Sequence, residues 1–317
     1  MNKAVFVSPW RHITPGKIGR WVLGLLKAVF IIGICFIILY PLLTKISMSL
    51  MDQRDLFNRL VKFIPNTLRL NNYPELMGYM KYGPALLNTL GLSTAVSLLQ
   101  VFSCSAAGYG FARFEFKGKR LLFAGVILAM ILPPFISITP LYLNFKQFDL
   151  FGLLPRDAFI GNPRPLLLMA LTATAPRCGL YIFLARQFFR GIPKEMEEAA
   201  VIDGAGPIRV FFSIMLRLAI PTLVTIFLFS FVWIYSDRLF TGMFYSSLDT
   251  LSKRLYLLGY SFGAALSMDA SGTAGNIGYI SIMQATGTLM TILPLVILYF
   301  FLQKTFVQSV ERTGLVG

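Results

Sequence analysis

Four acidic residues, Glu195, Glu197, Glu198 and Asp203, lie close together in a short polar segment between two long apolar runs. Two carboxylates can act as a general acid and a general base when both reach one substrate. Neighbouring positions on a helix point about 100° apart, so Glu197 and Glu198 cannot share a substrate in this way. The spacing therefore indicates a charged helix surface and not a catalytic pair.

The rest of the chain adds no catalytic or metal-binding pattern. It lacks the Gly-x-x-x-x-Gly-Lys-Ser/Thr loop, so it cannot bind ATP in that way. A serine nucleophile would need a base, and the only histidine, His12, stands at the far N-terminal end. Cys35, Cys104 and Cys178 lie in apolar stretches without metal-ligand spacing, as small core residues do. We predict no catalytic residue, no metal site and no cofactor on this chain, and an enzyme is the weakest hypothesis.

The polar segment carries the signals of a short helix over 193–206. Pro193 suits a first helical turn, and the acids that follow it are stabilised by the helix dipole. Ala199 and Ala200 give a small, smooth surface, and Gly204 permits a sharp exit. A helix of this kind is suited to docking into another protein.

The elements that must position this helix are predicted to cross a membrane. Hydrophobic residues make up 56% of the 317 residues, and the mean hydropathy is +0.68. An apolar stretch of about 20 residues is long enough to span a bilayer as a helix. Six such stretches occur, at 22–44, 85–108, 121–143, 166–186, 214–236 and 280–302. They predict an all-α, polytopic membrane protein with six transmembrane helices.

The chain divides into three parts on this basis. An N-terminal tail, 1–21, precedes the six-span domain, 22–302, and a C-terminal tail, 303–317, follows it. The six-span domain includes an outer cap of short helices over 45–84 and the loop with the acidic helix, 186–213.

The net charge of +15 could indicate nucleic-acid binding, so its distribution matters. With the acidic helix on the cytoplasmic side, six spans place both termini there too. The segments on this side hold 15 of the 29 Lys and Arg residues, with Arg113, Lys117, Lys119 and Arg120 in one short loop. This bias has the sign of the positive-inside rule. We predict a multi-pass protein of the cytoplasmic membrane that contacts lipid and binds no nucleic acid.

Several polar residues interrupt the predicted spans. Asn88, Gln100 and Gln284 either line a path for a solute or form hydrogen bonds between helices, and both interpretations stay open. Arg177 either lies in such a path or, as we prefer, marks a span that begins later than the apolar stretch. The spans contain no acidic residue, which argues against a carrier coupled to protons or sodium ions. The remaining possibility is a pore subunit driven by a separate ATPase.

The segment Glu198-Ala199-Ala200 with Gly204 resembles the EAA loop of binding-protein-dependent ABC importers. The flanking residues 186–195 and 202–205 resemble the carbohydrate-uptake permeases of this family, as do 108–114 and 88–90. The likeness extends over nearly all of the chain and is greatest for the second permease of maltose-type systems. It implies the type I ABC importer permease fold, with a cytoplasmic coupling helix.

The resemblance also implies partners and site residues. A cytoplasmic ATPase subunit, present in two copies, would bind ATP and Mg and receive the coupling helix in a surface cleft. Glu198 would pair with a basic residue there. The other partners would be a second homologous permease subunit and an extracytoplasmic sugar-binding protein. The coupling residues would be Glu195, Glu198, Ala199, Ala200, Asp203, Gly204 and Ala205.

The resulting hypothesis is a permease subunit that moves a sugar or oligosaccharide across the cytoplasmic membrane by alternating access. The alternative from another class is a non-catalytic membrane channel or scaffold without a dedicated ATPase. An ATPase that purifies with the chain would separate the two.

Overall fold

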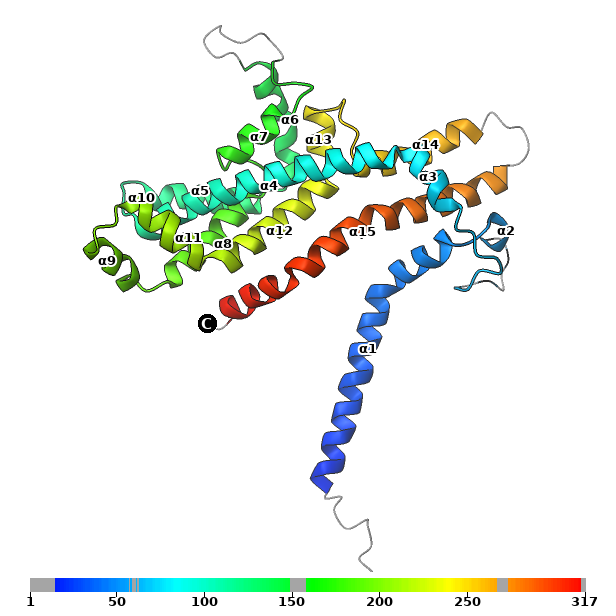
Figure 1. Cartoon of the computed structure of the whole chain (residues 1–317), viewed down its shortest axis with the longest axis horizontal. Coiled ribbons are helices and arrows are strands. Elements are labelled where there is room, and N and C mark those ends of the chain that lie inside the picture. The colour runs from blue at the N-terminus through cyan, green and yellow to red at the C-terminus, as the bar shows by residue number, and fades with distance from the viewer. Residues whose placement is uncertain are drawn as a thin grey trace, which may run out of the picture.

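The computed structural model describes residues 15–56, 58, 61, 63–148, 158–266 and 273–314, and helices are the only regular elements in these ranges (Figure 1). The predicted all-α class is therefore confirmed. His12 and most of the predicted N-terminal tail lie outside the described residues.

Three long helices run lengthwise through the molecule and form its frame (Figure 1): α4 (Tyr82–Arg113), α12 (Ile220–Ser236) and α15 (Thr273–Gly314). α4 packs against both α12 and α8 (Cys178–Gly191), and α12 packs against α15. Buried apolar side chains form two cores: the first includes Cys104, Phe189 and Ile226, and the second includes Leu76, Phe231 and Leu258. α4 and α12 contribute to both.

Shorter helices surround this frame. They are α2 (Gln53–Leu56), α3 (Asn72–Met80), α5 (Lys119–Ile131), α6 (Pro134–Lys146), α7 (Arg164–Leu171), α9 (Glu195–Ile202), α10 (Pro207–Val210), α11 (Leu216–Leu218), α13 (Leu239–Phe244) and α14 (Leu251–Leu266). A π-helical turn, η1 (Phe211–Met215), joins α10 to α11. Two of these short helices, α2 and α3, fall within the range 45–84; that this range forms an outer cap stays a prediction.

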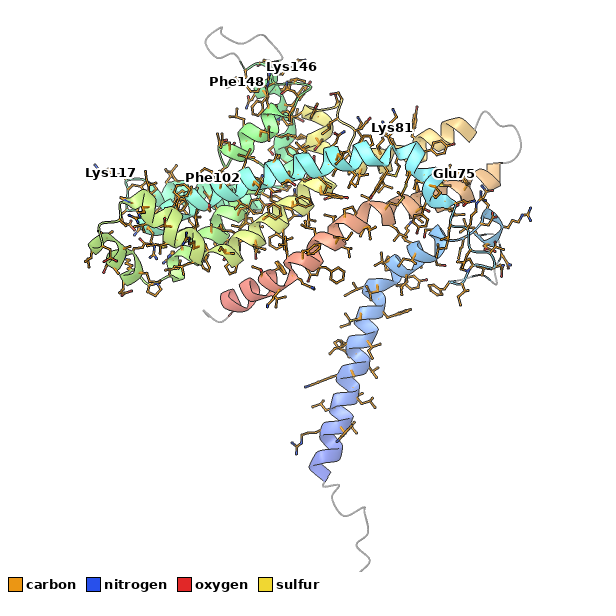
Figure 2. All side chains as sticks on the ribbon, in the orientation of Figure 1. Glu75, Lys81, Phe102, Lys117, Lys146 and Phe148 are labelled. Atoms are coloured by element: carbon orange, nitrogen blue, oxygen red, sulfur yellow. The ribbon has the colours of Figure 1, made fainter. Side chains whose placement is uncertain are left out.

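Helix α1 (Pro15–Ser49) stands away from the frame for most of its length (Figure 1). Its end near Ser49 packs against α15, but the apolar side chains before it are exposed; Ile37, for example, is 72% exposed. The side chains of its N-terminal part project from the helix without contacting the frame (Figure 2). This chain therefore leaves the apolar surface of α1 uncovered.

The structure supports fewer straight spans than the six predicted. Within the described residues, three helices are long and apolar enough to cross a membrane: Gly19–Ser49, Tyr82–Arg113 and Gly278–Val307. Two more pairs qualify only as bent spans: α5 with α6, bent by 109°, and Pro207–Leu218 with α12, bent by 77°. The count of six stays a prediction.

Proline explains the bend in the third predicted span. α5 ends at Ile131 and α6 begins at Pro134, so the break falls on Leu132-Pro133. A residue before proline is disfavoured in a helix, and proline itself has no N–H to donate. An irregular backbone at membrane depth is tolerated only inside protein or beside a cavity.

The fourth predicted span, 166–186, is wrong as one continuous helix. α7 ends at Leu171, and α8 begins only at Cys178. Ala173 and Arg177 both have positive φ angles, +56° and +70°, in the intervening turn. The run is continuous in hydropathy, but Pro176 disfavours helix at the residue before it.

Three of the predicted cytoplasmic segments, 109–120, 186–217 and the described part of 303–317, lie toward one end of the molecule, whereas the start of α1 lies away from it (Figure 1). This end contains α9, the end of α4 and the C-terminal part of α15, while α2 and α3 lie at the opposite end. Lys117 marks the first end and Glu75 the second (Figure 2). α15 continues to Gly314, so the predicted C-terminal tail, 303–317, extends the last helix over its described part.

Two glycines allow the helices to approach closely. A Cβ added to Gly108 on α4 would lie 2.5 Å from the Cβ of Ala185 on α8 and 2.9 Å from the backbone N of Arg186. A Cβ on Gly179 would lie 2.7 Å from the carbonyl oxygen of Val126 on α5. Small residues at such crossings are typical of helix packing in membranes.

Candidate functional site

The acidic segment forms α9, which we call the coupling helix, and its end is fixed by hydrogen bonds. Gly204 follows the helix with a φ of +84°. Its N–H donates to the carbonyl of Val201 (3.0 Å), and the N–H of Ala205 donates to the carbonyl of Ala200 (2.9 Å). These two bonds form a Schellman motif, in which glycine takes the left-handed position without a Cβ clash.

The predicted coupling residues lie on two faces of this helix. Ala200 is buried, with 8% of its surface exposed, and it packs into the first core together with the half-buried Ala205. The exposed ones are Glu195, Glu198, Ala199, Asp203 and Gly204. One face therefore attaches the helix to the frame, and the other is free to receive a partner.

Large apolar side chains next to this exposed face were missed by the sequence analysis. Ile202 is 85% exposed, Val201 is 58% exposed, and Ile208 on α10 is 76% exposed. Clustered exposed apolar side chains are typical of interaction surfaces. Their position in an otherwise polar segment was a signal that could have indicated them.

Arg113, at the end of α4, holds the coupling helix in place. Its Nε lies 2.6 Å from Oε1 of Glu197, and the Arg113 side chain is only 8% exposed. Its Nη2 donates to the carbonyl oxygen of Ile192 (2.7 Å), just before the helix. Glu197 therefore turns inward, whereas Glu195 and Glu198 face outward. Sequence reasoning found neither role, because 79 residues separate Arg113 from Ile192.

An aromatic cluster lies beneath this attachment. The ring of Tyr109 on α4 lies 5.5 Å from that of Phe189 on α8 and 5.0 Å from that of Phe211 in η1. Aromatic pairs at such separations contribute beyond their buried area. The cluster therefore joins α4, α8 and η1 in one packed unit next to the coupling helix.

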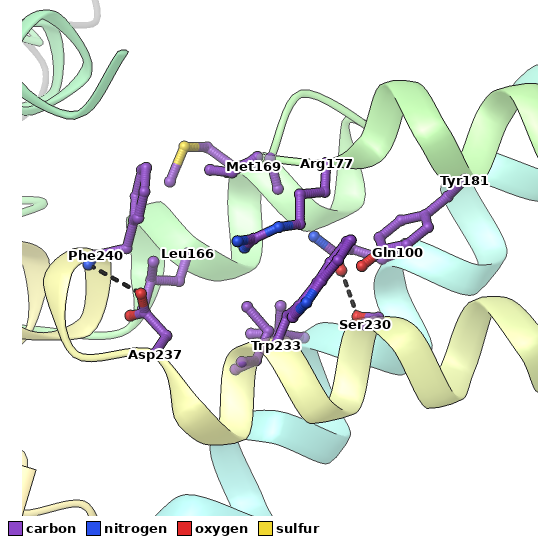
Figure 3. A pocket seen from close by; sticks show the side chains of 13 residues that line it. Gln100, Leu166, Met169, Arg177, Tyr181, Ser230, Trp233, Asp237 and Phe240 are labelled. Carbon is purple, nitrogen blue, oxygen red and sulfur yellow. Dashed lines mark hydrogen bonds between the residues drawn. The ribbon is translucent and has the colours of Figure 1, made fainter. Parts of the chain in front are cut away.

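A second candidate site is a small cavity in the middle of the frame (Figure 3). It has a volume of about 30 Å³, room for about one water molecule. α4, α7, α8, α12 and α13 each contribute lining residues. Gln100, predicted for the solute path, is one of them and is fully buried. The hydroxyl of Ser230 donates to Oε1 of Gln100 and lies 2.9 Å from Oγ of Ser97.

Arg177 lines the same cavity (Figure 3). α8 begins one residue later, so the helix does start later than the apolar stretch, while Arg177 itself lines the cavity. The guanidinium lies 4.0 Å from the centre of the Trp233 ring. Asp237 also lines the cavity, but its carboxylate accepts from the N–H groups of Phe240 (3.3 Å) and Thr241 (2.7 Å). Among the described residues, none offers Arg177 a carboxylate at ion-pair distance.

The other two predicted path residues lie elsewhere. The side-chain amide of Asn88 donates to the carbonyl oxygen of Asp249 (3.0 Å), before α14. Gln284 on α15 is exposed, and its Nε2 lies close to Gly259 on α14. The structure therefore does not bring Asn88, Gln100 and Gln284 together in one cavity.

Comparison with known proteins agrees with this geometry. Residues 101–312 match the family model of the binding-protein-dependent transport system inner membrane component. The chain is 31% identical over 283 residues to the melibiose/raffinose/stachyose import permease MelC of Bacillus subtilis, covering 89% of this chain and 92% of that protein. It is 26% identical over 279 residues to the trehalose transport system permease SugB of Mycobacterium tuberculosis, covering 88% and 93% of the two chains.

A solved structure has the same fold. The chain superposes with a TM-score of 0.70 and 20% identity on a chain of a bacterial ABC transporter involved in the import of the polysaccharide alginate. The superposition covers 91% of this chain and 98% of that one. This likeness shows that the fold is that of an ABC importer permease. Together with the match over 101–312, it shows that the chain belongs to the family of binding-protein-dependent transport system inner membrane components.

Proposed function

We propose that this chain is the permease subunit of an ATP-driven importer that moves a sugar or oligosaccharide across the cytoplasmic membrane by alternating access. The family and the sugar permeases among its relatives support this cargo class. The observation that carries the mechanism is the coupling helix, which is exposed on one face and bonded to the frame on the other.

The motor in this proposal is a separate cytoplasmic subunit in two copies, which binds ATP and Mg. Glu195, Glu198, Ala199, Asp203 and Gly204 would contact it directly, and Glu198 would pair with one of its basic residues. Ala200 and Ala205 would act from the inner face, by keeping the helix packed. The sequence supports this division because it contains no phosphate-binding loop.

The same proposal places the coupling helix and both termini on the cytoplasmic side. It adds a second, homologous permease subunit and an extracytoplasmic sugar-binding protein. A structure of a related transporter was determined in complex with a pentasaccharide-bound periplasmic protein, which supports the last partner. The uncovered apolar surface of α1 supports another membrane subunit, since lipid and protein are the two environments that accept it.

Within this subunit, we assign the solute path to the cavity at Gln100. Arg177 and Trp233 supply a charge and an aromatic face there, both of which suit a sugar or its acidic derivative. Gln284 is exposed and stays a proposed path residue, whereas the hydrogen bond of Asn88 to Asp249 favours a packing role.

The proposal is tested by adding a charge to the exposed face. Ala199→Asp leaves the core of this chain intact, because Ala199 is exposed. We expect the variant to insert normally, to lose uptake and to purify without the ATPase in mild detergent. Ala199→Ser is the control, because it adds a hydroxyl without charge, and it should keep both properties.

Two results would contradict the proposal. One is normal uptake in a well-expressed Ala199→Asp variant. The other is a wild-type chain that supports uptake and purifies with no nucleotide-hydrolysing subunit, which would favour the channel or scaffold.

A further inference from the structure

An open cleft with strongly basic walls lies beside the coupling helix. It has a volume of about 920 Å³ and is formed by the end of α4, the loop after it, the start of α5 and the last turns of α8. Its basic lining residues are Arg113, Lys119, Arg120, Arg186, Arg190 and Lys194. Glu115 is the one acidic residue in the lining. We call this region the basic cleft.

Most of this positive charge is not neutralised within the part of the chain that the structure describes. Arg113 is paired with Glu197, and Lys119 with Glu115 (2.8 Å). The other cations of the cleft have no carboxylate at ion-pair distance among the described residues; they are Arg120, Arg186, Arg190 and Lys194. An anion in the cleft would therefore meet an excess of positive charge.

The effect of this charge appears on Glu115. Its pKa is held below the usual range by the hydrogen bond and the charge of Lys119, with smaller contributions from Lys194 and Arg120. Glu115 is exposed to solvent, where charges are normally well screened. Cations from the start of α5 and from the segment before α9 thus act on one carboxylate.

Arg186 is fixed inside the cleft before any ligand arrives. Its guanidinium lies 3.9 Å from the centre of the Phe123 ring on α5. Its Nε is buried and has no hydrogen-bond partner. A guanidinium stacked on a ring keeps its remaining N–H groups in one plane, which suits binding of phosphate oxygens.

The cleft also has an apolar wall. The ring of Phe111 lies 6.0 Å from that of Phe116 and 5.5 Å from that of Phe123. Leu121, at the start of α5, is 79% exposed, and Leu128, further along the same helix, is 58% exposed. A hydrocarbon chain extending from the cleft would run along this apolar side of α5.

We propose that the basic cleft binds the phosphate headgroup of an anionic phospholipid, with the acyl chains along α5. The juxtaposition of unpaired guanidinium groups with exposed apolar side chains favours a lipid over free phosphate, which has no apolar part. The lipid would belong to the cytoplasmic leaflet, and only this assignment rests on the proposed function. Lys194 directly precedes the coupling helix, so a bound headgroup would stiffen the corner from which that helix extends.

The experiment is a lipid titration of the purified importer complex. The complex is delipidated in mild detergent, and bound phosphatidylglycerol is counted by native mass spectrometry. The test variant is Arg186→Gln with Arg190→Gln. One basic residue near a membrane surface changes affinity about fivefold, so we expect the double variant to bind about 25-fold more weakly. Phosphatidylcholine should bind no better to wild type than to the variant.

Arg238→Gln is the matched control. The Arg238 guanidinium is also stacked on an aromatic ring, 3.7 Å from the centre of Tyr256, but it does not line the basic cleft. We expect its phosphatidylglycerol binding to equal that of wild type. If the double Gln variant fails to assemble, Arg120→Gln at an exposed position should show the fivefold loss alone.

Three results would overturn the proposal. The first is equal lipid binding by wild type and the cleft variants, and the second is displacement of the lipid by millimolar inorganic phosphate. The third is the absence of lipid binding because an acidic surface of the ATPase occupies the cleft. The assay measures lipid and not uptake. If the lipid proposal fails, the transport proposal is unaffected. Conversely, loss of uptake by Ala199→Asp does not test lipid binding.

Discussion

At the scale of single residues, the coupling helix has one group of residues that faces the frame and another group that faces outward. Glu197 and Ala200 connect it to the frame, through Arg113 and through the first core. Glu198 and Ala199 remain exposed. Removing one partner of a partly buried ion pair leaves the other charge without compensation. Substitutions on the inner face should therefore loosen the helix, while those on the outer face should affect only its contact with a partner.

Gly204 provides a residue-scale prediction. A residue with a Cβ in the left-handed conformation costs about 1–2 kcal/mol, so Gly204→Ala should weaken the Schellman turn. Nothing lies within 4 Å of a Cβ built there, so the effect comes from the backbone and not from a clash. We expect hydrogen exchange of the peptide over 195–206 to accelerate about fivefold or more.

Gly206 is the matched control for this prediction. It lies two residues later, has equally open space for a Cβ and has an ordinary φ of −69°. Gly206→Ala should leave the exchange rate of the same peptide unchanged. Equal rates in the two variants would show that the left-handed turn does not stabilise the coupling helix.

At the scale of elements, close packing of α4 against α8 connects the coupling helix to the membrane-spanning frame. Gly108→Val would place side-chain atoms against Ala185 and the backbone of Arg186. Overpacking of this kind costs about 1–3 kcal/mol. We expect a lower thermal midpoint for the purified complex in detergent. Gly110→Val on the same helix meets open space, so it should change the midpoint little; equal losses would refute the packing role of Gly108.

The sequence predicted some elements accurately because their signals are local. The acids lie in the first turn of α9 and Gly204 follows its end, as predicted, but the helix spans Glu195–Ile202 instead of 193–206, and Pro193 lies before its N-cap. Hydropathy, in contrast, cannot distinguish a straight span from a broken one. The apolar run 166–186 contains the turn between α7 and α8, and Pro133-Pro134 fixes the place of the α5–α6 bend but not its angle of 109°.

The long-range parts of the candidate sites were beyond sequence reasoning. The ion pair of Arg113 with Glu197 joins segments far apart in the chain, as does the hydrogen bond of Ser230 to Gln100. Nothing in the local pattern around Gln100, Asn88 or Gln284 showed that only Gln100 would line the central cavity. Such pairings depend on how helices pack, which a single sequence does not specify.

At the scale of the whole molecule, the long helices α4 and α15 join the end that carries the coupling helix to the opposite end (Figure 1). α4, α8 and α12 pack against one another between α9 and the central cavity, so in the proposed mechanism they would carry a movement of α9 to the cavity. The subunit can thus act as a passive gate moved by a separate motor. That account requires the exposed face of α9 to touch a nucleotide-hydrolysing protein in the cell.

Site-specific crosslinking tests this requirement most directly. The exposed Cys35 is first replaced by serine, while Cys104 and Cys178 are buried and stay. A single cysteine is then placed at Ile202, 85% exposed beside the coupling residues, or at Ile64, 84% exposed in the predicted outer cap. We predict that Ile202→Cys captures an ATPase subunit in intact cells and that Ile64→Cys captures none. Capture of the ATPase from Ile64, or no capture from Ile202 in cells that import normally, would contradict the account.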